Sequence, residues 1–224
     1  MGNSANRFDE RLLEHWKRFE RQFEISERLG ALIFGDILYQ YDESHRKYHA
    51  VKHPVLLLDE LQIARRSMPD WFANPMQDAA ITLALFDHDL FYDPRATDNE
   101  ERSAGGALGH VHYLKLPERV GELANRFILA TKHVETPTEL GAMIVCDIDL
   151  SLMGASWTSF AQDSRDIRDE YAHVSDADFR RGRRDFLNGM LKRPRIYATN
   201  HFYGKFEVTA RENMERALRE QFAH

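Results

Sequence analysis

Cysteine is almost absent from this chain: Cys146 is the single one among 224 residues. One cysteine cannot form an intrachain disulfide, which suits a reducing compartment. It also cannot supply the several thiolates of a four-cysteine zinc site or an iron–sulfur cluster. These classes of protein are therefore excluded.

Long apolar runs and an excess of basic charge are also missing. No run approaches the roughly 18 apolar residues of a membrane span, and the first residues lack the apolar stretch of a secretory signal. The net charge is −6, which argues against nucleic-acid binding driven by overall charge. Hydrophobic residues make up 43% and charged residues 29%, as in ordinary globular proteins. We expect a cytoplasmic protein that binds neither nucleic acid nor membrane.

Strand-like alternation, internal repeats and low-complexity tracts are not found either. Apolar residues instead recur at helical spacing along most of the chain. Trp16 and Phe19 belong to a stripe that predicts one amphipathic helix over residues 8–28. The fold class expected is all-α.

Further helices are predicted from the same spacing. Thr136-Pro137-Thr138-Glu139 has the pattern of a capping box and predicts a helix that starts there and runs to Leu150. Segments around 79–86, 120–131, 179–190 and 207–222 are also predicted helical. The predicted loops are 67–76, 92–99 and 193–205, and none resembles a flexible linker. We therefore expect one domain over residues 1–224.

A first candidate element contains His49 and His53, which are four residues apart. On a helix these imidazoles would share one face about one turn apart. Pro54 follows immediately and removes a backbone donor, so a helix is expected to begin or kink here. Taken alone, such a pair also fits a helix surface or a hydrogen-bonded core pair.

A second candidate element ends a strongly apolar segment with three polar residues, Asp87, His88 and Asp89. Placing these side chains at the end of a buried helix is costly unless something neutralises them. Adjacent side chains diverge by about 100° on a helix, so His88 and Asp89 could share only an ion near the helix end. Imidazole and carboxylate together suit Zn, Fe, Mn or Mg.

A third candidate element, Cys146-Asp147-Ile148-Asp149-Leu150, again sets acids among apolar residues. Asp147 and Asp149 would project about 200° apart on a helix, so one site can use only one of them. The other is expected to be solvated or hydrogen-bonded.

Together these elements resemble the HD superfamily of metal-dependent phosphohydrolases, and more closely a subfamily of predicted HD phosphohydrolases. The similarity extends from about residue 8 to 220. It implies an HD-domain helical bundle with additional N- and C-terminal helices, a metal-site core at about 45–155 and a C-terminal part at about 156–224. The segments that carry it are Tyr48-His49-x3-His53, Phe86-x-His88-Asp89 with Tyr92-Asp93-Pro94, Asp98-Asn99-Glu100-Glu101 with Ser103-Ala104, and Asp147-Ile148-Asp149-Leu150-Ser151.

The resemblance implies a set of metal ligands and a proton donor. The ligands would hold one or two divalent ions (Mn, Mg, Zn, Fe, Co or Ni), and Asp89 is the candidate bridge between two. The first element is also similar to the Tyr-His-x3-His element of cyclic-nucleotide phosphodiesterases, in which the second histidine binds metal and the first acts as general acid. His49 is therefore the candidate acid, and the implied ligands are His53, His88, Asp89 and Asp149.

Other residues are candidates for contacts around the metal. Glu100 is a candidate catalytic group and His133 a candidate substrate contact, and either is alternatively a further ligand or a helix-terminal charge. The arginines between residues 165 and 195 are interleaved with acids, which favours a solvated, salt-bridged face. Arg168 and Arg183 are preferred as phosphate contacts because their segments resemble the subfamily. His110 and His112 would point apart on a helix and are assigned no role.

The function implied is hydrolysis of a phosphoester or phosphoanhydride bond in a small phosphorylated substrate, expected to be a nucleotide, by metal-activated water. The chain is also a candidate homodimer. Two alternatives belong to other classes: an HD-fold di-iron oxygenase, and a nucleotide-binding protein without catalysis.

Overall fold

The computed structural model describes residues 2–221, with side chains from Arg7 onward. Every regular element in this range is helical, which confirms the all-α prediction. The α-helices are α1 (Gly2–Gln22), α2 (Glu27–Tyr41), α3 (Lys52–Ser67), α4 (Pro75–Asp87), α5 (Asn99–Leu114), α6 (Glu118–Ala130), α7 (Leu140–Asp149), α8 (Trp157–Glu170), α9 (Asp176–Lys192) and α10 (Asn200–Glu220). Two short 3-10 helices, η1 (Pro69–Phe72) and η2 (Leu150–Gly154), follow α3 and α7.

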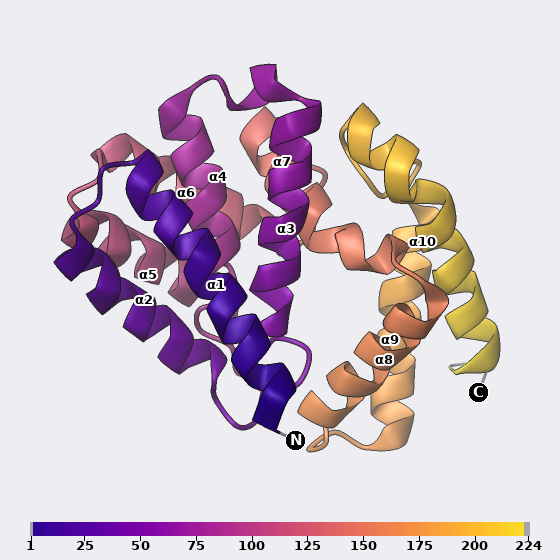
Figure 1. Ribbon diagram of the computed structural model, residues 1–224. Helices are drawn as coiled ribbons and strands as arrows, with labels where there is room; N and C mark the ends of the chain where they lie inside the picture. The colour runs from indigo at the N-terminus through magenta and orange to yellow at the C-terminus, as the bar shows by residue number, and fades with distance from the viewer. Residues whose placement is uncertain (1, 222–224) are drawn as a thin grey trace.

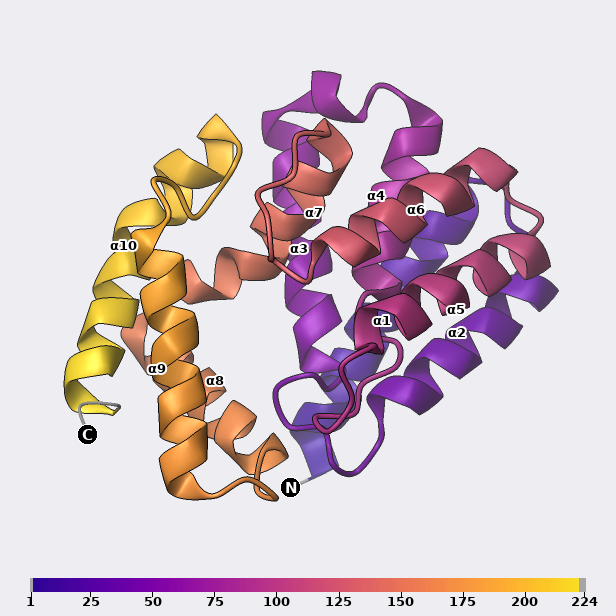
Figure 2. The same cartoon turned by 180° about the vertical axis from the view of Figure 1, so that it is seen from behind.

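Helix α4 occupies the middle of the bundle formed by α1 to α7, and α8 to α10 lie along one side of it (Figures 1 and 2). α4 packs against α3, α5, α6 and α7. Its residues from Asp78 to Asp87 are all buried, as expected for a helix that is apolar around its circumference. The residues that follow α4 are therefore delivered into the interior of the molecule.

The predicted helix over residues 8–28 is wrong in extent, because two helices meet there. α1 ends at Gln22, Glu24 adopts a left-handed backbone with φ 53°, and Ser26 caps α2 by accepting a hydrogen bond from the backbone of Leu29. Gly30 lies so close to α1 that a Cβ there would approach Glu20 Oε1 to 1.9 Å. The cap at Ser26 and the close approach of Gly30 favour a second helix, so α1 ends before the apolar pattern that predicted a single helix does.

The predicted start of the seventh helix is also wrong. α7 begins at Leu140, and Glu139 is the preceding N-cap residue with an extended backbone. The Glu139 carboxylate pairs with Arg126 across the surface at 2.9 Å instead of closing a capping box. Similarly, the predicted loop at 193–205 ends early, because Thr199 caps α10 and that helix starts at Asn200.

Among the residues described, no single helix is long and apolar enough to cross a membrane. The segments Leu140–Gly154 and Trp157–Glu170 have the required length and apolar composition only when taken together, and the chain bends by 105° between them.

His110, to which the sequence assigned no role, lies between two carboxylates near the end of α4. Its Nδ1 is 2.9 Å from Asp87 Oδ2 and its Nε2 is 3.1 Å from Asp36 Oδ2. Asp87 is completely buried. The pair neutralises one of the three polar residues whose burial the sequence had marked as costly.

The stability of the protein is expected to depend on pH through His110. Burial lowers the pKa of His110, but Asp87 and Asp36 raise it more, to about 9. Because this value exceeds the usual pKa of about 6.5, the stabilisation is complete below about pH 6.5 and is lost as the pH rises through 9. We expect the free energy of unfolding, measured with denaturant, to fall as the pH rises from 6 to 9.5. The fall should be up to about 3 kcal/mol larger in wild type than in His110→Asn. Parallel curves for the two proteins would contradict the assignment.

Candidate metal centre

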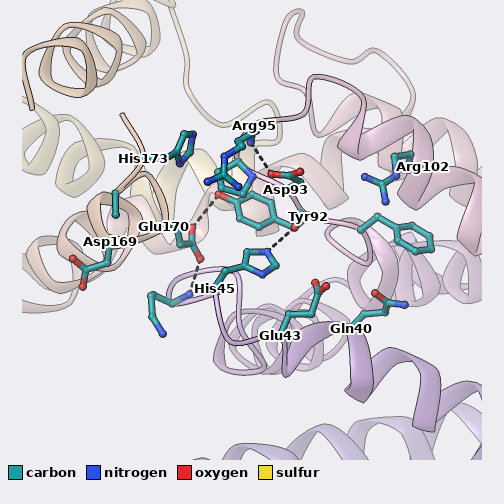
Figure 3. Close-up of a pocket in the computed structure, with 14 residues that line it drawn as sticks. Gln40, Glu43, His45, Tyr92, Asp93, Arg95, Arg102, Asp169, Glu170 and His173 are labelled. Carbon is teal, nitrogen blue, oxygen red and sulfur yellow. Dashed lines mark hydrogen bonds between the residues drawn. The ribbon is translucent and has the colours of Figure 1, made fainter. Parts of the chain in front are cut away.

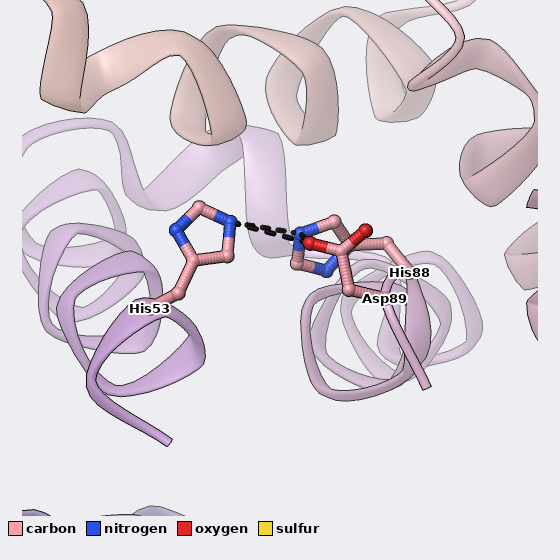
Figure 4. A group of neighbouring side chains, drawn as sticks. All are labelled: His53, His88 and Asp89. Atoms are coloured by element: carbon pink, nitrogen blue, oxygen red, sulfur yellow. Dashed lines mark hydrogen bonds and ion pairs between the residues drawn. The ribbon is translucent and has the colours of Figure 1, made fainter. Parts of the chain in front are cut away.

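His53 lies in the first turn of α3, which begins at Lys52. Pro54 follows it without disrupting the helix, because the first backbone N–H groups of a helix have no acceptor within it. The sequence had left open whether a helix begins or kinks here, and it begins. The His53 side chain is buried and faces the end of α4 (Figure 4).

His88 and Asp89 come directly after α4 and meet His53 there. The Nε2 atoms of the two histidines are 3.1 Å apart. Asp89 Oδ2 is 3.1 Å from His88 Nε2 and 3.6 Å from His53 Nε2. The three side chains each offer a ligand atom, and these atoms lie within 4.8 Å of one another.

Asp149, the last residue of α7, completes the group. Its Oδ1 is 3.4 Å from His53 Nε2 and 3.5 Å from His88 Nε2. Ligands about 2.0–2.3 Å from a shared ion lie roughly 3–3.5 Å apart around a tetrahedron or on adjacent octahedral positions. The structure thus brings together the four residues predicted as ligands, here called the His–Asp cluster, and the separation of each carboxylate from the two imidazole nitrogens suits a shared ion.

The charges of the His–Asp cluster also suit a divalent cation. Burial raises the pKa of both carboxyl groups, but neighbouring histidines hold it below the usual value, His88 most strongly for Asp89 and His133 for Asp149. Both carboxylates are therefore ionised at neutral pH. The Nδ1 atoms of His53 and His88 are buried without a hydrogen-bond partner, so Nε2 is the nitrogen that each ring offers to the cluster. Two imidazoles and two carboxylates form a donor set for Mn, Fe, Co, Ni or Zn.

Asp147 points away from the cluster, as the argument from helix geometry required of one of the two acids. Its Oδ1 accepts the backbone N–H of Ala198 at 2.7 Å. Its Oδ2 accepts the backbone N–H and the hydroxyl of Thr199, at 2.8 and 2.7 Å. Asp147 therefore anchors the start of α10, and Asp149 is the acid that lies in the cluster.

Arg46 joins two of the three chain segments that carry cluster residues, the one that leads into α3 and the one after α4, and the sequence had not indicated it. Its buried guanidinium donates to the backbone oxygens of His49, Asp89 and Leu90, at 3.3, 2.6 and 2.9 Å. It lies in the basic run His45-Arg46-Lys47, which is typical of a solvated surface. No local signal in the sequence distinguishes it from its neighbours.

His49 precedes α3 and is held by Glu170, the last residue of α8. His49 Nδ1 lies 2.7 Å from Glu170 Oε2, and the His49 ring stacks on Tyr92 with centroids 4.0 Å apart. Tyr92 donates its hydroxyl to the same Glu170 oxygen at 3.0 Å (Figure 3). Glu170 Oε1 accepts three consecutive backbone N–H groups, those of Lys47, Tyr48 and His49. The C-terminal helices thus position a side chain of the site.

The electrostatics around His49 favour its protonated form. Burial lowers the pKa of His49, but Asp89 and Glu170 together raise it above the usual value. Burial likewise opposes ionisation of Glu170, yet hydrogen bonds from His49 and the backbone lower its pKa to about 2. The pair is a histidinium beside a carboxylate.

A cavity of about 750 Å³ opens beside the His–Asp cluster. His133 reaches it from a left-handed backbone position and places Nε2 2.8 Å from Asp149 Oδ2. Most of the predicted site residues line this cavity, and His53 lies next to it through its contact with His88. Those that line it are His49, His88, Asp89, Glu100, His133, Asp149 and Arg183.

Arg168, by contrast, is used in contacts outside the cavity. It donates to the backbone oxygens of Tyr171 and Val174 and pairs with Asp176 at 2.6 Å. These contacts fasten the turn between α8 and α9. The structure does not bring Arg168 to the site with the other predicted residues.

Comparison of the chain with protein-family models, with curated proteins and with solved structures found no match.

Proposed function

We propose that this chain is a metal-dependent phosphohydrolase of the HD superfamily, acting on a phosphoester or phosphoanhydride bond of a small organic phosphate, with a nucleotide as the expected class. One observation supports the proposal most directly: α3, the end of α4 and α7 bring two imidazole nitrogens and two ionised carboxylates together beside a large cavity. Ionised carboxylates gathered in this way need a compensating cation, and a divalent ion bound by this donor set would supply it.

His53, His88, Asp89 and Asp149 would hold the metal in this proposal. A bound divalent ion would activate water and withdraw charge from the phosphoryl oxygens. Glu100, in the first turn of α5, and His133 both line the cavity. His133 contacts Asp149 and so fixes the direction of that carboxylate.

His49 would supply the proton that the leaving oxygen needs. Its Nδ1 faces Glu170, which leaves Nε2 to hold a proton, and the residue lines the cavity without belonging to the His–Asp cluster. Glu170 and Tyr92 fix the orientation of the ring. A positioned acid of this kind contributes roughly 10²–10⁴-fold to the rate.

The test is metal analysis of the purified protein, followed by activity assays. The protein is expected to bind one or two equivalents of a divalent ion and to lose phosphatase activity on chelation, with recovery on adding Mn²⁺ or Co²⁺. The assay panel should include nucleoside phosphates, a cyclic dinucleotide and p-nitrophenyl phosphate. Protein that binds no divalent ion under these conditions contradicts the proposal. Bound mixed-valent iron without phosphatase activity would instead indicate an oxygenase.

A further inference from the structure

Arg183, in the middle of α9, forms part of the cavity wall away from the His–Asp cluster. Its guanidinium lies over the ring of Phe186, 5.1 Å from the centroid. Around it the wall comes from α8, α9 and the turn between them and is mostly apolar, with Ile167, Tyr171, Val174, Phe179 and Phe186. Asp178 also lines it and pairs with Arg181. A cation is therefore presented in a mostly apolar part of the cavity.

This cation has no counter-charge among the side chains that the structure describes. Arg183 Nε is buried and has no hydrogen-bond partner. Other arginines nearby are paired, Arg181 with Asp178 and Arg168 with Asp176. Burial lowers the pKa of Arg183, and the only neighbours that oppose this are Tyr48 and Tyr171. A half-buried cation whose Nε lacks a partner lowers stability, which points to an anion supplied by a ligand.

The position of Arg183 is distinct from that of the proposed metal. Neither Asp89 nor Asp149 forms an ion pair with it, although each is paired with histidines of the cluster. Tyr48 lies between the cluster and Arg183. Its ring centroid is 4.8 Å from that of His53, and its hydroxyl interacts electrostatically with Arg183. Arg183 therefore has no ion pair with the cluster and is available to an anionic group other than the one at the metal.

We propose that Arg183 binds a second anionic group of the substrate, so that the preferred substrate is an organic phosphate with a further phosphate or carboxylate. The apolar wall would contact the aromatic or apolar moiety that joins the two charges. This inference rests on the proposed function for the first anionic group only. Recognition of the second group by Arg183 can be measured without turnover.

The binding test uses metal-free protein, in which no metal ion can bind the first anionic group. Titration calorimetry with adenosine 3′,5′-bisphosphate and 4-carboxyphenyl phosphate would compare wild type, Arg183→Met and Arg184→Met. Arg184 lies on the same helix outside the catalytic cavity, so it is the matched control for charge. Loss of a charge-assisted hydrogen bond should weaken binding about 10- to 100-fold in Arg183→Met and leave Arg184→Met like wild type. Equal binding by wild type and Arg183→Met, or none by either, overturns the proposal whatever the activity of the protein.

The turnover test uses metal-loaded protein and two matched pairs of substrates. Adenosine 3′,5′-bisphosphate is paired with adenosine 5′-monophosphate, and 4-carboxyphenyl phosphate with phenyl phosphate. Wild type and Arg184→Met should have a higher kcat/KM for the doubly anionic member of at least one pair. The pair in which this preference occurs tells whether the second anionic group is a phosphate or a carboxylate. Arg183→Met should lose that preference, while hydrolysis with an unchanged preference overturns the role of Arg183 but not the proposed function.

A stability measurement separates recognition from a structural role. Removing an unpaired cation should raise Tm, by about 2–4 °C for each kcal/mol gained. Arg183→Lys keeps the charge and should keep part of the substrate preference. A lower Tm in Arg183→Met, together with complete loss of binding in Arg183→Lys, would show that the residue is structural and would overturn the proposal.

Discussion

Asp149→Asn is expected to remove bound metal and to lower kcat/KM by at least about 10³-fold, whereas Asp147→Asn should leave both close to wild type. The two acids are separated by one residue on α7 but face different surroundings. Asp149 Oδ1 lies 3.4 Å from His53 Nε2, inside the His–Asp cluster. Metal content by mass spectrometry and kcat/KM on the best substrate measure the effect.

Asp147→Asn is the matched control, since it makes the same chemical change on the same helix. Its expected effect is on stability, because the carboxylate accepts three hydrogen bonds from Ala198 and Thr199. An amide keeps one acceptor oxygen, so the free energy of unfolding should fall by about 2–3 kcal/mol. The reverse pattern, with metal lost from Asp147→Asn and kept by Asp149→Asn, would rule out the cluster as the metal site.

The convergence of the cluster residues was implied by the resemblance to the HD superfamily, and a local pattern with a physical cost supported it for His88 and Asp89. Asp87, His88 and Asp89 end a helix that is apolar all round, so their burial needed partners. Helix geometry limited one site to either Asp147 or Asp149, and the resemblance implied Asp149. The structure pairs Asp87 with His110 and places His88 and Asp89 beside His53.

Contacts between distant segments could not be anticipated in this way. Glu170 and His49 are 121 residues apart, and nothing near Glu170 distinguishes it from the other acids of its segment. The sequence instead favoured Arg168, in the same segment, as a phosphate contact, but Arg168 stabilises a turn. The buried role of Arg46 likewise depends on three carbonyl groups that only the folded chain brings together.

The predicted positions of two helix ends were wrong for a related reason. The pattern Thr136 to Glu139 satisfies a capping box, but the Glu139 carboxylate has a competing partner in Arg126 on the preceding helix. The apolar stripe through Trp16 and Phe19 continues past Gln22, where the backbone turns to start α2. At Glu139 a tertiary contact outweighed a local preference worth about 1 kcal/mol, and at Gln22 a cap for the next helix ended the stripe.

The arrangement around His49 allows the proton donor to be tested apart from the metal. His49→Ala should keep the metal, because His49 Nδ1 is directed to Glu170 and not to the cluster. It should lose about 10²–10⁴-fold in kcat for a substrate with an alkoxide leaving group. The loss should be much smaller for p-nitrophenyl phosphate, since p-nitrophenolate leaves without protonation. His112→Ala, at an exposed histidine of α5, is the matched control and should behave like wild type.

Glu170→Gln should show a weaker form of the same defect. The amide keeps an oxygen for the backbone N–H groups but removes the negative charge beside His49, whose pKa should therefore fall. The loss in kcat should be smaller than in His49→Ala, should grow with pH as the imidazole loses its proton, and should shrink for p-nitrophenyl phosphate. These three features together distinguish a positioned acid from a residue that only packs. A His49→Ala protein that is metal-loaded, fully active on both classes of substrate and less stable would show that His49 and Glu170 form a structural pair between α8 and the segment before α3.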